Sequence, residues 1–283
     1  MISVFNHNYT ATVPKDLKFD NEISQKENLN ANTHLWIQSN GTVYKQYAIY
    51  NEVTDKNISN LTKIMKIKSL KHIPELSLPL AVYSNSDGKV DGYLMEYHNM
   101  HPLSHYIDER NHMVVLKAFQ QLSDVIDKLP KTVYIGDLHA GNILVGQESI
   151  RLIDIDGFSL KYGHKISCPL DAFSGHSIFY QRKYCDRMGS FYISRDSDIC
   201  CVLWLFLSYL METNPFDYTE DELRHYFLFL KDLGLPQDLY KMVNCMMSPK
   251  RNYLIPSVFE KVPMQMLDCC SYKEYVRCSC NSI

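Results

Sequence analysis

The chain of 283 residues lacks an excess of either charge. It carries 29 basic and 32 acidic side chains, which gives a formal net charge of −3 with neutral histidines. Nucleic-acid-binding domains and segments that bind anionic membranes usually concentrate basic residues, so we expect neither partner. The hydrophobic fraction of 46% and the charged fraction of 22% are ordinary for globular proteins and leave enough apolar residues for a sizeable core.

Long hydrophobic runs are also absent. The longest apolar stretch, Ile199–Met211, contains Ser208 and is too short to cross a bilayer, so it predicts a buried helix. Residues 1–16 lack the basic segment followed by an apolar segment that a secretory signal would need. We therefore expect a cytoplasmic protein without a signal peptide or a membrane span.

Cysteine does not occur in the patterns of a structural zinc site. The nine cysteines are an odd number, and several fall within predicted helices, which suits free thiols in a reducing cytosol. The C-terminal cluster, Cys269-Cys270 and Cys278-Ser279-Cys280, lacks the usual pairs separated by two to four residues. The sequence therefore does not favour a metal-binding tail.

Glycine is scarce in the N-terminal part, and the first of the 11 glycines is Gly41. A G-x-G-x-x-G loop, which brings a backbone close to nucleotide phosphates in many enzymes, therefore does not precede residue 41. Residues 1–29 are polar and weakly patterned, so they predict no particular fold.

The most informative stretch runs from Lys131 to Phe158. Short apolar runs flank a polar turn, Gly136–Asn142, and a third run, Ile150–Ile153, leads into Asp154-Ile155-Asp156. Carboxylate and amide oxygens on short strands joined by tight turns are a rigid way to hold Mg²⁺, which prefers oxygen ligands in near-octahedral geometry.

The polar groups of this stretch have a specific spacing. Asp137 and Asn142 form D-x-x-x-x-N, and Asp154 follows in L-I-D, where kinases carry the Asp of D-F-G. In these motifs the chain resembles the protein-kinase-like superfamily. The resemblance implies that Asp137 orients the acceptor hydroxyl and accepts its proton, while Asn142 and Asp154 hold Mg²⁺ on the phosphates of ATP. An ordinary hairpin with surface carboxylates is the alternative.

The catalytic-loop motif departs from that of protein kinases in two places. Ile135-Gly136 stands in place of His-Arg, so control by a phosphorylated activation loop is not expected. His139 stands where serine kinases carry Lys, and the form D-x-H-x-x-N is similar to aminoglycoside and choline kinases. His139 would neutralise the transferring phosphate if protonated; alternatively, it merely orients Asp137 or Asn142.

The D-F-G motif is replaced by Asp154-Ile155-Asp156. If the preceding strand continued, both carboxylates would point to the same side, because alternate residues of a strand share a face. Asp154 is the preferred metal ligand because the apolar run ends there.

A hairpin is predicted from residues 34–37 and 42–47, because Asn40-Gly41 between them is the strongest short hairpin signal. The second strand carries Lys45, in a position similar to the Lys of V-A-I-K in kinases. By that resemblance Lys45 is a catalytic and nucleotide-binding residue that contacts the ATP phosphates. The alternative is one solvated lysine among many.

Apolar residues at helical spacing predict a helix over about 55–70 that packs on this small sheet. In active kinases the matching helix supplies a Glu to the strand Lys. The helix body contains no Glu, and Glu52 is the better placed of the only two acids nearby. Glu52 would otherwise be a charge that stabilises the start of the helix.

Two further strands are predicted between residues 78 and 97. The second ends in Leu94-Met95-Glu96-Tyr97, which resembles the hinge of kinases. Because the backbone reads adenine there, the resemblance implies contacts from the Glu96 carbonyl and the His98 amide, with Met95 lining the adenine pocket. A buried strand end without a ligand is the alternative.

The C-terminal half is predicted to be helical. Its expected helices cover about 115–126, 199–211, 223–233 and 238–247, and the irregular residues 158–195 would form an activation and substrate-binding segment. Asp196-Ser197-Asp198 opens the apolar helix as in the central helix of protein kinases. The resemblance implies that Asp198 anchors the catalytic-loop backbone; alternatively, Asp198 serves only as a helix cap.

Together these features predict an α+β protein with a bilobal protein-kinase-like fold. A small antiparallel β-sheet lobe with one helix would cover residues 1–97, and a mainly helical lobe would cover 98–283. The resemblance implies an ATP-dependent phosphotransferase with Mg²⁺ as its cofactor, acting as a serine/threonine protein kinase on a protein substrate. A small-molecule kinase, favoured by His139, and a pseudokinase that acts as a binding scaffold are the alternatives. The missing glycine loop favours the scaffold, and the retained catalytic-loop residues oppose it.

Overall fold

The computed structural model describes residues 10–12, 21–22, 33–38, 40–47, 52–84, 89–160, 163–165, 191–248 and 250–280. For 10–12, 21–22, 33, 52–57, 163–165, 191–192 and 280 it describes the backbone alone. The chain divides into two compact units, one of residues 1–100 with 151–158 and one of residues 101–150 with 159–283. Residues 151–158, which follow the predicted catalytic loop, therefore belong to the N-terminal unit.

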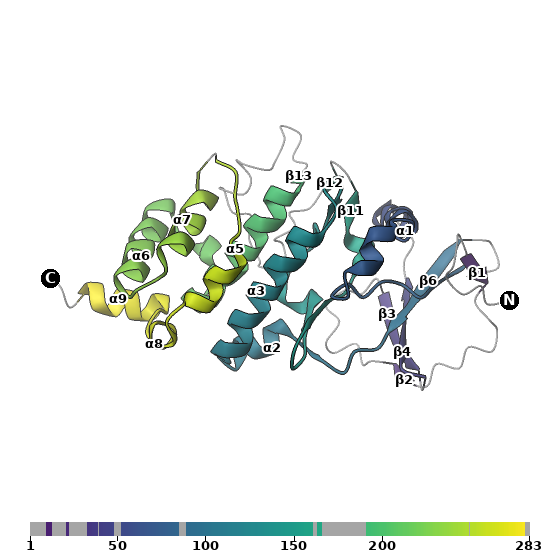
Figure 1. Ribbon diagram of the computed structural model, residues 1–283, viewed down its shortest axis with the longest axis horizontal. Helices are drawn as coiled ribbons and strands as arrows, with labels where there is room; N and C mark the ends of the chain where they lie inside the picture. The colour runs from purple at the N-terminus through teal and green to yellow at the C-terminus, as the bar shows by residue number, and fades with distance from the viewer. Residues whose placement is uncertain are drawn as a thin grey trace. The chain divides into compact units, whose positions relative to one another are not determined.

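The first unit is built on a six-stranded sheet with the order β1-β5-β6-β4-β3-β2. Neighbouring strands are antiparallel, except that β1 runs parallel to β5. The strands of this sheet, which Figure 1 labels except for β5, are β1 Thr10–Thr12, β2 Asn21–Glu22, β3 Thr33–Gln38, β4 Thr42–Tyr47, β5 Ala81–Ser84 and β6 Val90–Glu96. Both β1 and β2 lie in the stretch whose side-chain pattern predicted no fold.

The hairpin of β3 and β4 confirms the prediction from Asn40-Gly41. Gly41 has a φ of 78°, which glycine adopts without the steric cost that a side chain would bring. Its amide donates to the Gln38 carbonyl at 3.1 Å, which closes the turn. The turn fixes the pairing that places Leu35 opposite Lys45.

The two faces of the sheet carry different cores. Val43 and Tyr47 pack with Tyr93 on one face, which is also the face of Lys45 by strand alternation. Tyr44 packs on the opposite face with residues of β5. Gly92 of β6 is needed for close approach, because a Cβ there would lie 2.2 Å from the Lys45 carbonyl oxygen. The position of Lys45 therefore depends on close contact between β4 and β6.

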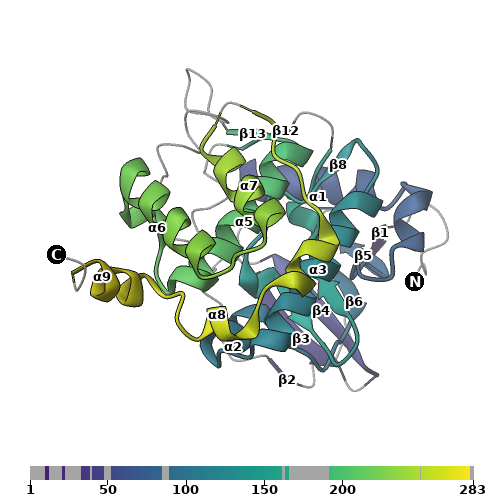
Figure 2. The same cartoon turned by 60° about the vertical axis from the view of Figure 1, so that its left-hand side comes forward.

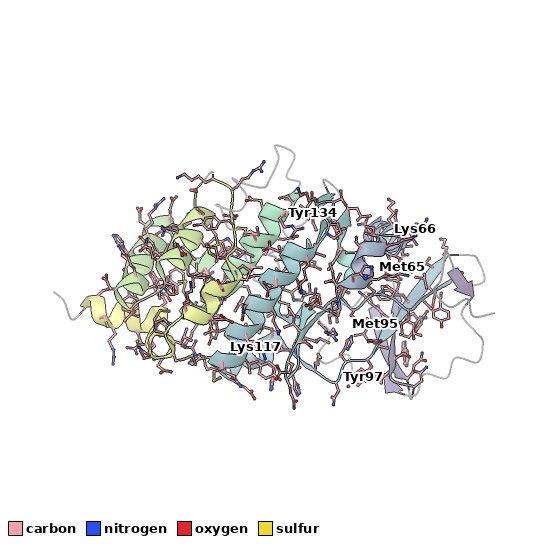
Figure 3. All side chains as sticks on the ribbon, viewed as in Figure 1. Met65, Lys66, Met95, Tyr97, Lys117 and Tyr134 are labelled. Carbon is pink, nitrogen blue, oxygen red and sulfur yellow. The ribbon has the colours of Figure 1, made fainter. Side chains whose placement is uncertain are left out.

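Helix α1, Glu52–Ile64, covers the face that carries Val43 and Tyr47. Leu61 is fully buried there, and Met65 packs beside it just after the helix (Figure 3). The predicted helix extended to residue 70, but the chain instead forms a short 3₁₀ helix, η1, at Lys68–His72.

Residues 151–158 are joined to the first unit by backbone hydrogen bonds. The Leu152 amide donates to the Glu75 carbonyl at 2.7 Å, and the Ser77 amide donates to the Leu152 carbonyl at 2.9 Å. Beyond β10, Ile150–Leu152, a 3₁₀ turn, η3, covers Ile155–Gly157. The side-chain amide of Asn60 on α1 donates to the Phe158 carbonyl at 3.1 Å, so the helix is tied to the end of this segment.

The second unit is mainly helical. Its helices are α2 Leu103–Asp108, α3 His112–Lys128, α5 Arg195–Met211, α6 Glu220–Asp232, α7 Gln237–Met246, α8 Met264–Leu267 and α9 Tyr272–Cys280, with 3₁₀ turns η2 Ala140–Asn142, η5 Pro215–Asp217 and η6 Pro256–Lys261. Three short antiparallel pairs accompany them: β7 His101–Pro102 with β9 Ile143–Val145, β8 Val133–Tyr134 with β11 Ser159–Leu160, and β12 Gly163–Lys165 with β13 Phe191–Ile193. The α+β class is therefore confirmed, with the sheet in the N-terminal region and the helices in the C-terminal part.

Helix α5 is the core of the second unit, as its apolar sequence predicted. The rings of Phe206 on α5 and Phe119 on α3 meet edge to face at 5.2 Å, and Phe259 of η6 lies 5.2 Å from Phe206. Figures 1 and 2 show α3 and α5 side by side. Among the described residues, no helix is long and apolar enough to cross a membrane.

The cysteine side chains that the structure describes are not in disulfide bonds: Cys200, Cys201, Cys245, Cys269, Cys270 and Cys278. The expectation of thiols rather than disulfides is confirmed for these positions. Cys168, Cys185 and the side chain of Cys280 lie outside the described residues.

Candidate functional site

Lys45 is the centre of a buried charged cluster within the first unit. Its side chain leaves the middle of β4, and the residue is only 7% exposed. The ammonium group donates a hydrogen bond to Asp154, and it also lies 3.0 and 3.3 Å from the two carboxylate oxygens of Asp156. The alternative of a solvated lysine is therefore wrong.

Asp156 is the most enclosed member of this cluster, at 1% exposure. Its Oδ1 accepts hydrogen bonds from Lys45 and from the Tyr93 hydroxyl at 2.7 Å, while its Oδ2 accepts from Lys45 and from the Tyr47 hydroxyl at 2.9 Å. Both oxygens thus have two donors, which offsets the large cost of burying a carboxylate.

The charges of the cluster stabilise one another. Burial alone would lower the pKa of Lys45, but the carboxylates of Asp154 and Asp156 raise it well above its ordinary value. Burial opposes ionisation of Asp156 too, yet Lys45 and the two tyrosine hydroxyls lower its pKa. Burial is the main cause that raises the pKa of Tyr93 and of Tyr47, and the charge of Asp156 raises both further. Both phenols therefore stay neutral. One cation faces two carboxylates, and the cluster carries a net negative charge.

Asp154 holds the exposed part of that charge. The strand β10 ends at Leu152, and Asp154 adopts a left-handed backbone conformation with a φ of 62°. Its side chain is 28% exposed, whereas that of Asp156 is 2% exposed. A continuing strand would have aimed both carboxylates to one side, but the turn replaces that strand. Because the oxygens of Asp156 are used internally, Asp154 is the carboxylate that a cation can reach.

The side-chain oxygens of Asp154 and Asn142 are suitable ligands for Mg²⁺ by their chemistry. No group of three or more His, Cys, Asp or Glu residues that could hold a metal occurs within the described ranges. Mg²⁺ commonly takes only one or two protein oxygens and completes its coordination with water and substrate phosphates. Asp154 and Asn142 each carry a side-chain oxygen of the kind that Mg²⁺ takes.

The predicted helix partner of Lys45 was Glu52. Glu52 is the first residue of α1, but its side chain lies outside the described residues, so this pairing stays a prediction. The contacts of Asp156, Tyr47 and Tyr93 were missed from the sequence. Tyr47 shares the face of Lys45 by strand alternation, which was the one available signal.

The hinge candidates lie at the end of β6. Met95 is 7% exposed and packs with Val43 in the core of the first unit, while Tyr97 is exposed and its amide donates to the Gly41 carbonyl at 3.0 Å (Figure 3). Glu96 is exposed and ends the strand. Adenine contacts from Met95, Glu96 and His98 stay predictions.

His98 has a partner and an altered acidity. Its Nε2 lies 3.2 Å from the Ser77 hydroxyl. Burial, followed by the nearby charge of Arg151, lowers the pKa of His98, although Glu96 acts in the opposite direction. His98 is therefore held mainly as a neutral ring beside the end of β6.

The catalytic-loop candidates lie within the second unit. Asp198 of α5 accepts hydrogen bonds from the amides of Ile135 and Gly136, both at 2.9 Å. The anchoring contact that the resemblance implied is thus present. The alternative of a helix cap is wrong, because Ser194 caps α5 in a reciprocal pair with Ser197.

Asp137, His139 and Asn142 are linked through the backbone of this loop. The Asn142 side-chain amide donates to the Asp137 carbonyl at 3.1 Å, and the Asn142 backbone amide donates to the His139 carbonyl at 3.0 Å. His139 Nδ1 accepts from the Gly141 amide at 3.2 Å, so this nitrogen carries no proton in that contact. The loop therefore brings Asp137 and Asn142 together and uses the His139 ring in its own turn.

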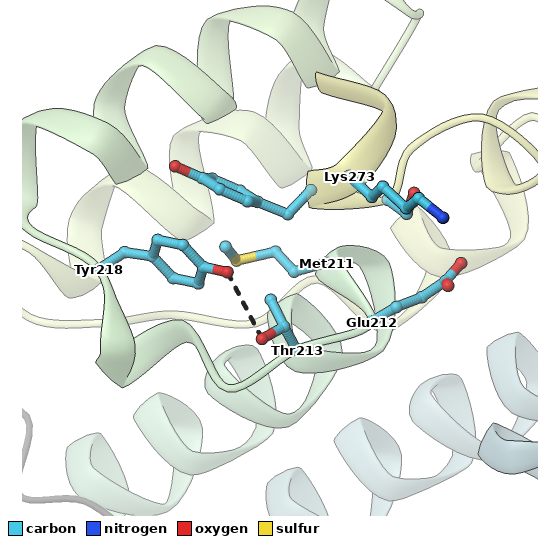
Figure 4. A pocket seen from close by; sticks show the side chains of 7 residues that line it. Met211, Glu212, Thr213, Tyr218 and Lys273 are labelled. Atoms are coloured by element: carbon cyan, nitrogen blue, oxygen red, sulfur yellow. Dashed lines mark hydrogen bonds between the residues drawn. The ribbon is translucent and has the colours of Figure 1, made fainter. Parts of the chain in front are cut away.

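Two hollows in the second unit involve other residues. One of about 450 Å³ is lined by Tyr134, Ser194, Arg195, Asp196, Ile199, Arg251 and Asn252. The other, of about 270 Å³, lies beside Tyr218 and Tyr272, and in it the Tyr218 hydroxyl faces Thr213 (Figure 4). None of the predicted site residues lines either hollow.

Comparison with known proteins finds no matching protein-family model and no matching curated relative.

Proposed function

We propose that this protein is an ATP-dependent phosphotransferase with a bilobal protein-kinase-like fold, whose two units correspond to the two lobes. The observation that carries the proposal is the hydrogen bond between the Lys45 ammonium and Asp154. It joins the strand lysine that resembles V-A-I-K to the carboxylate that resembles the Asp of D-F-G, although 109 residues separate them. These are the groups that bind phosphates and metal in protein kinases.

The predicted residues other than Glu52 and His139 have roles in this reaction. Lys45 contacts the α- and β-phosphates, and Met95 with the backbone of Glu96 and His98 binds adenine. Asp154 and Asn142 would hold Mg²⁺, and the metal would supply neutralisation of charge on the phosphate oxygens. Asp137 orients the acceptor hydroxyl and accepts its proton as the hydroxyl oxygen bonds to the γ-phosphorus, whose bond to the bridging oxygen breaks so that ADP leaves.

The loop that Asp198 anchors also supports the proposed phosphoryl transfer. Phosphoryl transfer is catalysed mainly by positioning and charge neutralisation. Asp198 fixes the amides just before Asp137, and Asn142 bonds to the Asp137 carbonyl. A rigid loop of this kind suits an acceptor-orienting carboxylate. Its anchor on an Asp-led apolar helix favours a serine or threonine of a protein as the acceptor.

The test is transfer of label from γ-labelled ATP with Mg²⁺ to three sets of acceptors: generic proteins, small hydroxyl compounds and the protein itself. We expect phosphoserine or phosphothreonine on protein. Transfer to small compounds alone would establish the small-molecule kinase instead. ATP binding without transfer to any acceptor would establish the scaffold and overturn the proposed activity.

A further inference from the structure

In active kinases a glutamate on a helix holds the strand lysine, but Lys45 is held by a carboxylate from a different element. The described body of α1, residues 58–64, contains no acidic side chain. Asp156 instead reaches Lys45 from the 3₁₀ turn after β10. Both its carboxylate oxygens lie within 3.3 Å of the ammonium nitrogen.

The surroundings of Asp156 keep its carboxylate in one place. The Tyr93 and Tyr47 hydroxyls donate to its two oxygens at 2.7 and 2.9 Å, from neighbouring strands of the sheet. Tyr93 stands directly opposite Lys45 in the pairing of β4 with β6, and its ring centroid lies 5.6 Å from the Lys45 nitrogen. The strands that carry Lys45 therefore also carry the groups that position its partner.

We propose that Asp156 is the positioning residue for Lys45, supplying from the turn after β10 the carboxylate that kinases place on a helix. This inference rests on the proposed function, because it assigns Lys45 to the phosphates of ATP. A lysine ammonium has three donors. If Asp154 bound a cation, the Lys45 donor that now bonds to Asp154 would be available to a phosphate oxygen, and Asp156 would keep the ammonium in position.

The two aspartates therefore have separate roles. Asp154 is partly exposed and exchanges partners, whereas Asp156 is enclosed and does not. Binding of phosphate by Lys45 then depends on the sheet and on η3, both in the first unit. It does not depend on an acid in the body of α1.

The chain offers a matched control for testing this role. Asp91 is another aspartate bonded to a tyrosine in the first unit: it accepts from the Tyr44 hydroxyl at 2.6 Å and from the Gln46 side chain at 3.1 Å. Tyr44 belongs to the core on the opposite face of the sheet from Lys45. Asp91→Asn thus removes a partly buried carboxylate whose partners Tyr44 and Gln46 alternate with Lys45 along β4.

The experiment measures the affinities of the full chain for ATP·Mg²⁺ and for adenosine, which lacks phosphate. Asp156→Asn should weaken ATP binding by about 10- to 100-fold, the scale of one hydrogen bond to a charged group, and leave adenosine binding within about twofold. Asp91→Asn should change neither affinity. Lys45→Met should weaken ATP binding to a similar extent, and combining it with Asp156→Asn should add little, because both changes remove the same interaction.

Several outcomes would overturn this role. Equal ATP affinity in the parent and Asp156→Asn would do so, as would equal losses for ATP and adenosine, which indicate a structural effect alone. A selective loss of ATP affinity in Glu52→Gln, with none in Asp156→Asn, would assign the role to the helix residue. Tyr93→Phe keeps the ion pair and gives a milder second variant; it should weaken ATP binding a few-fold and spare adenosine. A parent that binds no ATP overturns the proposed function and this inference together, whereas a parent that binds ATP separates them.

Discussion

Two buried aspartates, one in each unit, hold functional groups in different ways. Asp156 accepts hydrogen bonds from a lysine and two tyrosines, so it binds side chains that include a charge. Asp198 accepts hydrogen bonds from two consecutive backbone amides, so it binds the main chain of a turn. Both residues are 1% exposed.

Because their partners differ, the two aspartates control different properties. A carboxylate that neutralises a lysine determines where a positive charge lies, so its loss should appear in phosphate binding and in the pH dependence of stability. A carboxylate that binds two amides determines the shape of a loop, so its loss should appear in stability and in turnover. Under the proposed function, loss of Asp156 should therefore affect nucleotide binding, and loss of Asp198 should affect the geometry of phosphoryl transfer.

The largest loss of stability is expected for Asp198→Ala. The amides of Ile135 and Gly136 would lose their acceptor, and a buried unsatisfied group costs roughly 1–3 kcal/mol, so the free energy of unfolding should fall by about 4 kcal/mol. Chemical denaturation measures this loss. Ser194→Ala, which removes only the cap of the same helix, should cost about 1 kcal/mol. Equal losses in the two variants would mean that Asp198 does not hold the turn.

A somewhat smaller loss, with a different dependence on pH, is expected for Asp156→Asn. Removing one partner of a buried ion pair should cost about 3 kcal/mol near neutral pH. Because the pKa of Asp156 is lowered on folding from an ordinary value of 3.8, its contribution is complete above pH 3.8 and is lost as the pH falls below that value. The stability difference between parent and variant should therefore shrink in acid.

Denaturation of both proteins across the acid range measures this shrinkage. A difference that stays constant to the lowest pH would show that the charge of Asp156 contributes nothing. Asp198→Ala serves as the comparison, because its largest effect should come from unsatisfied amides, which do not titrate.

The smallest of the three effects concerns the metal. Mg²⁺ should raise the affinity for ATP about tenfold, equivalent to about 1.4 kcal/mol, and Asp154→Ala should remove this increase. Titrations of ATP with and without Mg²⁺ measure it. If Asp156→Ala removed the increase and Asp154→Ala did not, the enclosed carboxylate would be the metal ligand and the division of roles between the two aspartates would be wrong.

Local signals made much of the fold predictable. Asn40-Gly41 has the residue types that a tight hairpin needs, and the apolar run 199–211 can only be buried as a helix. The contact of Asp198 was predictable because motif resemblance links it to one short loop. The strands β1 and β2 were missed because they join the sheet through backbone pairing in a stretch with no clear alternation of polar and apolar residues.

The contacts of Lys45 could not be read from the sequence. They depend on the left-handed conformation of Asp154, which ends the alternation of the strand and starts a 3₁₀ turn. Only that turn brings Asp156 to a lysine that lies 111 residues earlier. Tyr93 lies opposite Lys45 only in the observed register of β4 with β6, and short-range sequence patterns do not determine that register.

Comparison of Asp137→Asn with the parent tests most directly whether this protein transfers phosphate. The substitution keeps the volume of the side chain and removes the basic oxygen of the loop that Asp198 anchors. Transfer of the γ-phosphoryl should fall by about 100-fold or more, the scale of losing a general base, while affinity for ATP·Mg²⁺ and the melting temperature change little. A parent that transfers phosphate, with an Asp137→Asn variant that transfers it equally well, would contradict the role of the loop; a parent that transfers none would contradict the activity itself.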